Sequence, residues 1–211
     1  MRLLVTAGPT REFMDPVRYI SNRSSGKMGY AIAAAARARG HEVVLISGPV
    51  SLLAPAHVDL VKVVSAADML AAVESHLDWC EALIMAAAVS DWRPATFQPQ
   101  KMKKLKTPPE LRLELTADIL QAITPRKGKR IIVGFAAETS AVEAEARRKL
   151  ESKGLDMIVA NDVSQPDAGF DVDTNRVVFI TKESPSDALP LMSKAEVGGR
   201  IVQWVEKQYA R

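Results

Sequence analysis

The sequence alternates short, uninterrupted apolar runs with longer segments of helical periodicity, and this alternation constrains the fold more than any other feature. The apolar runs lack the regular polar positions of a strand with one wet face, so we expect strands that are buried on both sides. Such strands occur in parallel sheets that helices cover on both faces. The runs predicted as strands are 3–7, 42–47, 58–64, 82–88, 131–136, 155–160 and 176–181. The segments predicted as helices are 26–39, 66–77, 140–153 and 193–208.

Residues suited to ligand binding follow directly after several predicted strands, in the segments 10–29, 87–93, 135–139 and 161–162. The carboxyl ends of parallel strands meet at one edge of a sheet, and ligands bind at that edge where the strand order reverses. The sequence therefore predicts a single Rossmann-like α/β domain over residues 1–211, with a mostly parallel sheet, helices on both faces and one composite site.

The loop at 22–27, Asn-Arg-Ser-Ser-Gly-Lys, leads into an alanine-rich helix. Successive backbone N–H groups at the start of a helix bind anions, because the helix dipole adds positive potential there. The loop differs from the P-loop, since only one glycine precedes Lys27 and Met28 follows it, and it lacks the first glycine of GxGxxG. A serine-capped helix start without a ligand explains the same residues equally well. The candidate phosphate-binding and substrate-binding residues are Asn22, Ser24, Ser25, Gly26 and Lys27.

The segment 97–114 interrupts the alternation with three prolines and with lysines at 101, 103, 104 and 106. It is too polar for a core element and too rich in proline for a helix. Leu111, Leu113 and Leu115 alternate with charged residues, which predicts a half-exposed strand at its end. A lysine run is most often a solvated face, but a tethered positive segment also suits a polyphosphate leaving group. We interpret the segment as a protruding flap or as an arm that reaches a partner.

Asp91 is a candidate ligand-binding residue that follows a strand ending in small side chains. The alanines at 86–88 let a ligand approach the backbone closely, and Asp91 is then placed to bind a ribose hydroxyl or Mg²⁺. An aspartate in a turn is the commoner role for such a residue, so the sequence leaves both open.

Three further candidates each have a structural alternative. Phe135 ends a strand, where it stacks on a base or packs in the core. Lys149 and Lys153 lie four residues apart on one helical face, where they point into the site or pair with neighbouring glutamates. Asn161 and Asn175 are interpreted as turn residues.

Composition excludes several classes of protein. The net charge of +3 is explained by one lysine cluster, so it does not require a nucleic-acid partner. The single cysteine, Cys80, lies in an apolar run, which indicates a buried thiol and a reducing compartment. No apolar run has the length of a membrane span, the start lacks signal-peptide features, and the three histidines lack metal-ligand spacing. We expect a cytoplasmic protein.

Along nearly its whole length the chain resembles the phosphopantothenoylcysteine synthetase domain of bacterial coenzyme A biosynthesis proteins. The resemblance rests, in order, on TAGPTREFMDPVRYISNRSSGKMGYAIA, AAAVSDWRP, KMKK, VGFAAET, ANDVSQPDAGFDVDTN and LPLMSK. It implies a ligase that joins 4′-phosphopantothenate to L-cysteine, with CTP activating the carboxylate as an acyl-cytidylate and with release of PPi and CMP. It also implies Mg²⁺ with CTP, and a homodimer in which the flap completes each site.

In most bacteria this domain is fused behind a flavin-dependent decarboxylase. Met1 here begins at the synthetase strand, so we expect a monofunctional protein or an excised domain, without a flavin of its own. A phosphopantothenoylcysteine decarboxylase, separate or fused, is then a possible partner, whereas nucleic acid and membrane are not expected.

The resemblance also implies roles for matching positions. Asn22 matches an asparagine that contacts the acyl group of the intermediate, and Lys101 matches a lysine of the CTP site, so these are the predicted catalytic residues. The family often has Asn-Pro where this chain has Thr116 and Ala117, which leaves nucleotide contacts there to backbone atoms. No metal ligands are assigned. The predicted CTP-binding residues are Met85, Ala86, Ala87, Asp91, Lys101, Thr116, Ala117, Asp118, Ile119, Phe135, Lys149 and Lys153.

Two alternatives of other classes remain. In the first alternative the chain is a non-catalytic nucleotide-binding module. In the second it is a Rossmann-type reductase that uses NAD(P)H. The presence of Asn22 and Lys101 disfavours the first, and the absence of GxGxxG disfavours the second.

Overall fold

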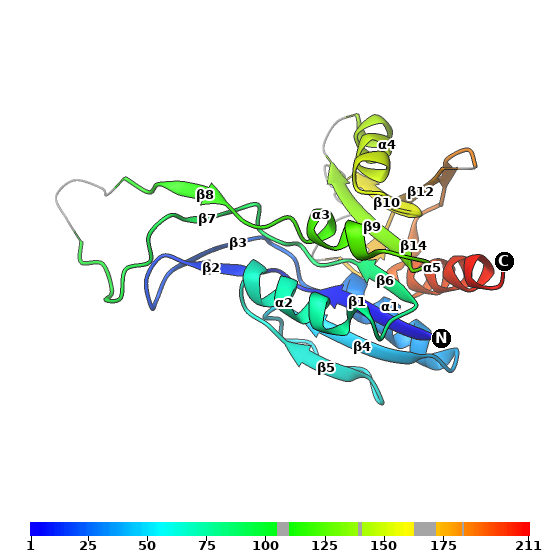
Figure 1. Ribbon diagram of the computed structural model, residues 1–211, viewed down its shortest axis with the longest axis horizontal. Helices are drawn as coiled ribbons and strands as arrows, with labels where there is room; N and C mark the ends of the chain where they lie inside the picture. The colour runs from blue at the N-terminus through cyan, green and yellow to red at the C-terminus, as the bar shows by residue number, and fades with distance from the viewer. Residues whose placement is uncertain (105–109, 139–140, 163–171, 183) are drawn as a thin grey trace.

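The computed structural model describes residues 1–104, 110–138, 141–162, 172–182 and 184–211 (Figure 1). Parts of the predicted segments, among them Lys106, Thr139 and Ser140, lie outside these ranges. Within the described ranges, no helix has both the length and the apolar character that a membrane span requires.

In the described part of the chain, eight strands form the central sheet in the order β13-β12-β10-β9-β6-β1-β4-β5. Neighbours from β10 to β5 are parallel, and β12 and β13 extend the sheet in antiparallel pairing. The prediction of a mostly parallel, Rossmann-like sheet is confirmed. The strands are β1 (Arg2–Ala7), β4 (Glu42–Ser47), β5 (Asp59–Lys62), β6 (Ala82–Met85), β9 (Ile131–Glu138), β10 (Met157–Asp162), β12 (Val177–Thr181) and β13 (Asp187–Ala188).

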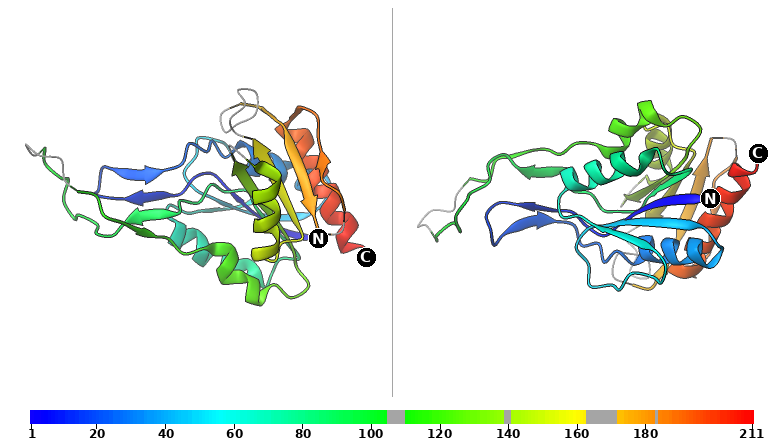
Figure 2. Two further views of the ribbon diagram at one scale, coloured as in Figure 1. Left: turned by 90° about the horizontal axis from the view of Figure 1, so that it is seen from above. Right: turned by 60° about the horizontal axis from the view of Figure 1, so that its bottom comes forward.

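Helices cover both faces of this sheet, as Figures 1 and 2 show. Alternate residues of β1 enter different cores: Leu3 and Val5 pack in the core with α1 and α5, whereas Leu4 packs with α2, α3 and α4. The strands are therefore apolar on both sides, which explains their uninterrupted apolar runs. The helices are α1 (Lys27–Ala38), α2 (Ala66–Leu77), α3 (Ile119–Ile123), α4 (Val142–Ser152) and α5 (Lys194–Tyr209), with a 3₁₀ turn at Thr124–Arg126.

Two short ribbons project from the body of the molecule beside each other (Figures 1 and 2). The sequence analysis predicts only one of their four strands, because each strand has only three residues and little burial. The predicted half-exposed strand exists at β8, but it is exposed throughout, with Leu113 47% and Leu115 69% exposed, because no core covers either side in one chain. The ribbons are β2 (Arg11–Phe13) with β3 (Tyr19–Ser21), and β7 (Trp92–Pro94) with β8 (Leu113–Leu115); a smaller pair joins β11 (Thr174–Asn175) to β14 (Met192–Ser193).

The predicted boundaries differ most where a strand meets the carboxyl edge. The run 82–88 was predicted as a strand, yet β6 ends at Met85. The following alanines leave the sheet because their backbone bonds to the loop after β1, with a single bridge between Pro9 and Ala88. Cys80 is buried as predicted, and burial raises the pKa of its thiol to about 11.

The first turn of α1 packs unusually close to the carboxyl end of β1. A Cβ on Gly29 would lie 2.5 Å from Ala7 Cβ and 2.8 Å from Thr6 O, so only glycine fits there. Gly26, directly before the helix, has a φ of +79°, which favours glycine as well. These two residues place the N-terminus of α1 at the edge where the strand order reverses between β1 and β6.

Replacing Gly29 by alanine should therefore destabilise the protein by about 1–3 kcal/mol, since the methyl group meets backbone atoms of β1 that cannot move aside. Gly199→Ala in α5 is the matched control, because a Cβ there meets nothing within 4 Å. The control should be neutral or stabilising by up to about 1 kcal/mol, as alanine favours helix. Urea unfolding of both variants measures the difference, and equal effects would show that the contact at Gly29 does not limit packing.

Candidate active site

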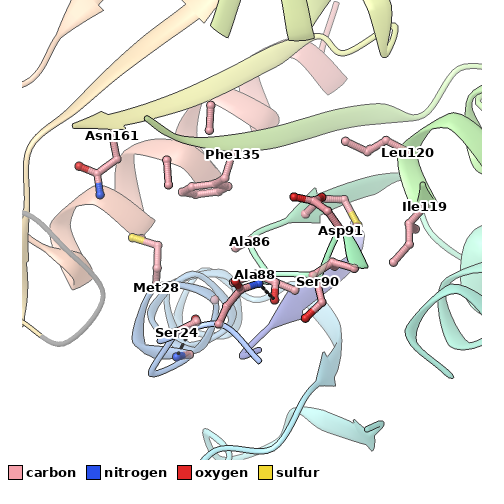
Figure 3. A pocket seen from close by; sticks show the side chains of 18 of the residues that line it. Ser24, Met28, Ala86, Ala88, Ser90, Asp91, Ile119, Leu120, Phe135 and Asn161 are labelled. Atoms are coloured by element: carbon pink, nitrogen blue, oxygen red, sulfur yellow. Dashed lines mark hydrogen bonds between the residues drawn. The ribbon is translucent and has the colours of Figure 1, made fainter. Parts of the chain in front are cut away.

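A cavity of about 740 Å³ lies at the carboxyl edge of the sheet, beside the reversal between β1 and β6. Its walls come from the loop and first turn at 22–29, the segment 85–91 after β6, the segment 115–121, and the end of β9. Figure 3 shows the ring of Phe135 inside it, with Met28 and Asn161 on one side and Asp91 on the other. A pocket of this volume holds a small-molecule ligand.

The cavity brings together all but one of the residues that the sequence singles out. Lys101 is the exception: it is exposed on the segment that extends from β7, and it does not line the cavity of its own chain. The predicted residues that do line it are Asn22, Ser24, Ser25, Gly26, Lys27, Met85, Ala86, Ala87, Asp91, Thr116, Ala117, Asp118, Ile119, Phe135, Lys149 and Lys153. Their individual roles stay predictions.

Hydrogen bonds join the loop after β1 to the loop after β6 and so build one wall. Ala88 N donates to Gly8 O at 2.9 Å, and Thr10 N donates to Ala88 O at 3.3 Å. The side chain of Asn22 joins the same wall, because its Nδ2 donates to Ala88 O at 3.0 Å. Asn22 is thereby placed over the small residues that end β6, at the mouth of the cavity.

The helix that follows the predicted phosphate loop is not capped by a serine. The N-cap of α1 is Gly26, which makes no side-chain cap hydrogen bond, and the first turn contains no acidic residue. The serine-capped alternative is therefore wrong. Gly26 N instead donates to Ser24 Oγ at 3.3 Å. The positive end of the helix dipole is therefore directed at the cavity without a side-chain cap at the N-cap position.

Lysines line the cavity on several sides, and two of them, Lys27 and Lys153, form ion pairs. Lys27 Nζ lies 2.7 Å from an oxygen of Asp173, an exposed carboxylate whose pKa this lysine lowers by hydrogen bond and by charge. Lys153 forms an ion pair with Asp118, so its partner is not one of the neighbouring glutamates. Asp118 also caps α3, because Gln121 N donates to its Oδ1 at 3.0 Å.

Several lining residues are not among the predicted site residues, and four of them are buried and polar. Asn161 and Asn175, interpreted as turn residues, are 9% and 4% exposed and line the cavity. Lys194 is 6% exposed, and its Nζ donates to Val172 O at 2.6 Å. The usable signal was the position of Asn161 at the carboxyl end of β10, next to the end of β9. Ser90, the fourth, is next to Asp91, which the same analysis named.

Ser90 is held rigidly in the wall, yet its hydroxyl has no hydrogen-bond partner among the described residues. Ser90 N donates to Thr10 Oγ1 at 2.9 Å, and Ser90 O accepts from Thr116 Oγ1 at 2.5 Å. Asn161 Oδ1 likewise has no partner within the described ranges. Buried polar atoms are nearly always paired, so these two atoms are candidates for ligand contacts.

The carboxylates that line the cavity are Asp91 and Asp118, of which Asp118 is already engaged by Lys153. In the described residues no three histidine, cysteine or acidic side chains gather closely enough to form a metal centre. A Mg²⁺ ion that binds through a substrate's phosphates needs only one or two protein carboxylates, so such an ion does not require a metal centre of this kind.

The fold and this cavity define a doubly wound α/β domain with a lysine-lined site at the reversal of strand order. Residues 1–209 match the family described as DNA/pantothenate metabolism flavoprotein C-terminal domain, and the chain belongs to this family.

The relatives carry a more particular name. Coenzyme A biosynthesis bifunctional protein CoaBC of Bacillus subtilis (strain 168) is 49% identical over 202 residues, which are 95% of this chain and 50% of the relative. The protein of the same name from Escherichia coli (strain K12) is 45% identical over 213 residues, 99% of this chain and 52% of the relative. The chain therefore spans about half the length of these relatives. A crystal structure of the C-terminal domain of CoaBC has a TM-score of 0.85 and 43% identity, covering 99% of this chain and 95% of that one.

The wall can be tested by comparing Thr10→Val with Ser90→Ala. Thr10 is fully buried, and its loss leaves Ser90 N–H without an acceptor, so Thr10→Val should destabilise the free protein by about 1–3 kcal/mol. Ser90→Ala removes a hydroxyl that is unpaired in the described structure and should change stability by less than about 0.5 kcal/mol. Urea unfolding without ligands measures both. A Ser90→Ala loss as large as that of Thr10→Val would refute the proposed wall.

Proposed function

We propose that this chain is a phosphopantothenate–cysteine ligase that joins 4′-phosphopantothenate to L-cysteine with CTP, through an acyl-cytidylate, releasing PPi and CMP. The observation that supports it most is the convergence of Asn22, the uncapped N-terminus of α1 and the lysines of α4 on one cavity. Family membership adds weight, since relatives over 40% identical are named for coenzyme A biosynthesis. We place the reaction in the cytoplasm.

The cavity offers complementary surfaces for the parts of CTP. Met85, the small residues Ala86 and Ala87, and the ring of Phe135 give the cavity apolar surface suited to a pyrimidine base. Lys149 and Lys153 supply positive charge for the phosphates, and Asp91 suits a Mg²⁺ ion carried by them. Bound Mg²⁺ would neutralise charge on the triphosphate.

Activation and transfer divide the reaction into two balanced steps. A carboxylate oxygen of 4′-phosphopantothenate attacks the α-phosphorus of CTP, and the bond to the β-phosphate breaks as PPi leaves. The amine of cysteine then attacks the acyl carbon, the bond to CMP breaks, and the amine loses a proton. Both steps build negative charge on oxygen, so fixed N–H donors and lysines stabilise them most.

Asn22 is suited to the acyl centre. Its amide carries two N–H donors and no charge, and the contact with Ala88 O fixes its position. A donor of this kind stabilises the acyl oxyanion that develops when the amine attacks, without bringing a competing charge. No histidine lines the described part of the cavity, so positioning of the amine takes the place of a histidine base.

Lys101 requires a second chain, and we propose a homodimer in which it reaches the partner's cavity. It stands on a projecting segment, outside the cavity of its own chain. The ribbons that bear it expose large apolar side chains, which a second copy would cover. These are Phe13, Val17, Tyr19, Trp92, Phe97, Leu111, Leu113 and Leu115.

The product then passes to a phosphopantothenoylcysteine decarboxylase, fused or separate. No flavin, nucleic acid or membrane takes part in the proposed reaction of this chain.

The two-step scheme predicts an acyl-cytidylate before cysteine is added. CTP, Mg²⁺ and 4′-phosphopantothenate should release PPi and leave the intermediate on the protein, detected by mass spectrometry after an acid quench. NADPH is the control for the alternative that the chain is a reductase, and ATP is the control for the choice of nucleotide. CTP binding without turnover would indicate a non-catalytic binding module. PPi release that requires cysteine, with no intermediate, would contradict the scheme.

Asn22→Ala should slow the reaction about a hundred-fold or more without unfolding the protein.

Lys101→Gln should slow PPi release steeply while weakening CTP binding much less, because a contact that strengthens in the transition state acts mainly on rate. Lys104→Gln is the matched control, being a neighbouring exposed lysine with no assigned contact. Rapid-quench rates and CTP titrations give the two quantities. Equal, mild losses in both variants would mean that the lysines act only by diffuse attraction.

A further inference from the structure

A fully buried carboxylate, Asp15, joins the turn of the β2–β3 ribbon to the segment that follows β7. It belongs to the turn between β2 and β3, and one of its oxygens serves that turn. Oδ1 accepts from Val17 N at 2.8 Å and from Arg18 N at 2.9 Å. Such a pattern stabilises a tight turn, and many aspartates do no more than this.

The other oxygen of Asp15 reaches out of the turn to the lysine-bearing segment. Oδ2 accepts from Met102 N at 3.1 Å and from Arg18 Nη1 at 2.9 Å. The same guanidinium nitrogen donates to Met102 O at 3.2 Å, so both backbone groups of Met102 are bound. Nearby, Gln98 N donates to Met14 O at 2.8 Å. A turn of the β2–β3 kind needs none of these contacts, which join segments more than eighty residues apart.

The charge of Asp15 is stabilised where it lies. Burial raises the pKa of the carboxyl, but hydrogen bonds from backbone N–H groups of Val17, Met102 and Arg18, together with the charge of Arg18, outweigh burial and lower the pKa. The carboxylate therefore stays ionised at neutral pH, and charge-assisted hydrogen bonds hold Met102 more firmly than neutral ones.

Met102 directly follows Lys101, and Lys103 and Lys104 come next. The segment thus leaves β7, is fixed at Gln98 and Met102, and presents its first lysine between these two points. A side chain that must meet a triphosphate gains rate when its backbone is already in place, because the ordering entropy is not lost at each turnover.

We propose that Asp15 is a positioning residue that latches the lysine-bearing segment to the β2–β3 ribbon and so holds Lys101 in place for nucleotide activation. The inference rests on the proposed role of Lys101, but the latch itself is a property of the free protein. The experiment therefore has one arm for the latch and one for the reaction.

The latch is measured by limited trypsin digestion of the whole chain under native conditions. Asp15→Asn keeps the shape of the side chain, but it turns an N–H group toward the N–H donors of Met102 or Arg18. The segment is then held less firmly, so trypsin cleavage after Lys101, Lys103 and Lys104 should quicken at least about tenfold. The control Asp78→Asn removes an exposed carboxylate that pairs with two arginines away from the ribbons, and should leave cleavage unchanged. Unchanged cleavage in Asp15→Asn would overturn the latch.

The reaction is measured as the rate of PPi release in a double-mutant cycle with Lys101→Gln. Asp15→Asn should slow the wild-type rate by about ten- to a hundred-fold, and add little in the Lys101→Gln background, because it acts through that lysine. A merely structural role would multiply the two losses. A slow Lys101→Gln protein with a normal Asp15→Asn protein would overturn this inference alone, whereas a silent Lys101→Gln would overturn the proposed role of the lysine and this inference with it.

Met102→Pro provides a second route should Asp15→Asn fold poorly. Proline removes the N–H group of Met102 that donates to Asp15 Oδ2. Met102 lies outside any strand, and the substitution leaves the β2–β3 turn intact. It should quicken cleavage after Lys103 and Lys104 and slow PPi release as Asp15→Asn does; the bond after Lys101 is left out of the comparison, because trypsin does not cleave before proline. Normal cleavage and rate in Met102→Pro would overturn the proposal.

Discussion

The packing of the first turn of α1 against the carboxyl end of β1 is the contact on which the site depends. Gly29 permits it, since any side chain there would meet Ala7 and Thr6, and Gly26 turns the chain into the helix with a left-handed backbone. The loop before the helix is thereby brought to the reversal of strand order, where Asn22 bonds to Ala88. The N-terminus of α1 and a small-residue wall then face each other across the same cavity, although 66 residues separate Asn22 from Ala88 in sequence.

Positive charge around this cavity is held in place by ordinary contacts before any ligand arrives. Lys27 pairs with Asp173, Lys153 with Asp118, and the buried Lys194 donates to a carbonyl. Fixed charges need no reorganisation when a phosphate group changes its charge distribution, which is why preorganised sites stabilise transition states. The ribbons extend the same principle outside the cavity, because Asp15 fixes the backbone beside a lysine that does not line the described cavity of its own chain.

The sequence predicted those parts of the molecule that burial periodicity and chain order determine. Continuous apolar runs identified the central strands, and their carboxyl ends marked the lining residues at 22–29, 86–91 and 135–137, whereas those at 116–119 came only from the family resemblance. The β2–β3 ribbon and strand β7 were missed, because three-residue strands with exposed side chains leave no periodic pattern, whereas alternating leucines identified β8. Lys194 and Asn175 were missed as well, since a lysine at a helix start and an asparagine in a turn are normally exposed, and only tertiary contacts bury them. The Asp15 latch joins positions too distant for any local pattern to reveal.

The central claim is that each reaction centre combines the cavity of one chain with Lys101 of another. Complementation tests it most directly: Asn22→Ala and Lys101→Gln chains are refolded together, and ligase turnover is compared with that of each variant alone. In a symmetric dimer with shared sites, a mixed pair has one site with both defects and one with neither, so the mixture should recover about a quarter of wild-type turnover. A mixture no more active than its parents, with mixed dimers demonstrated by native mass spectrometry, would contradict the account.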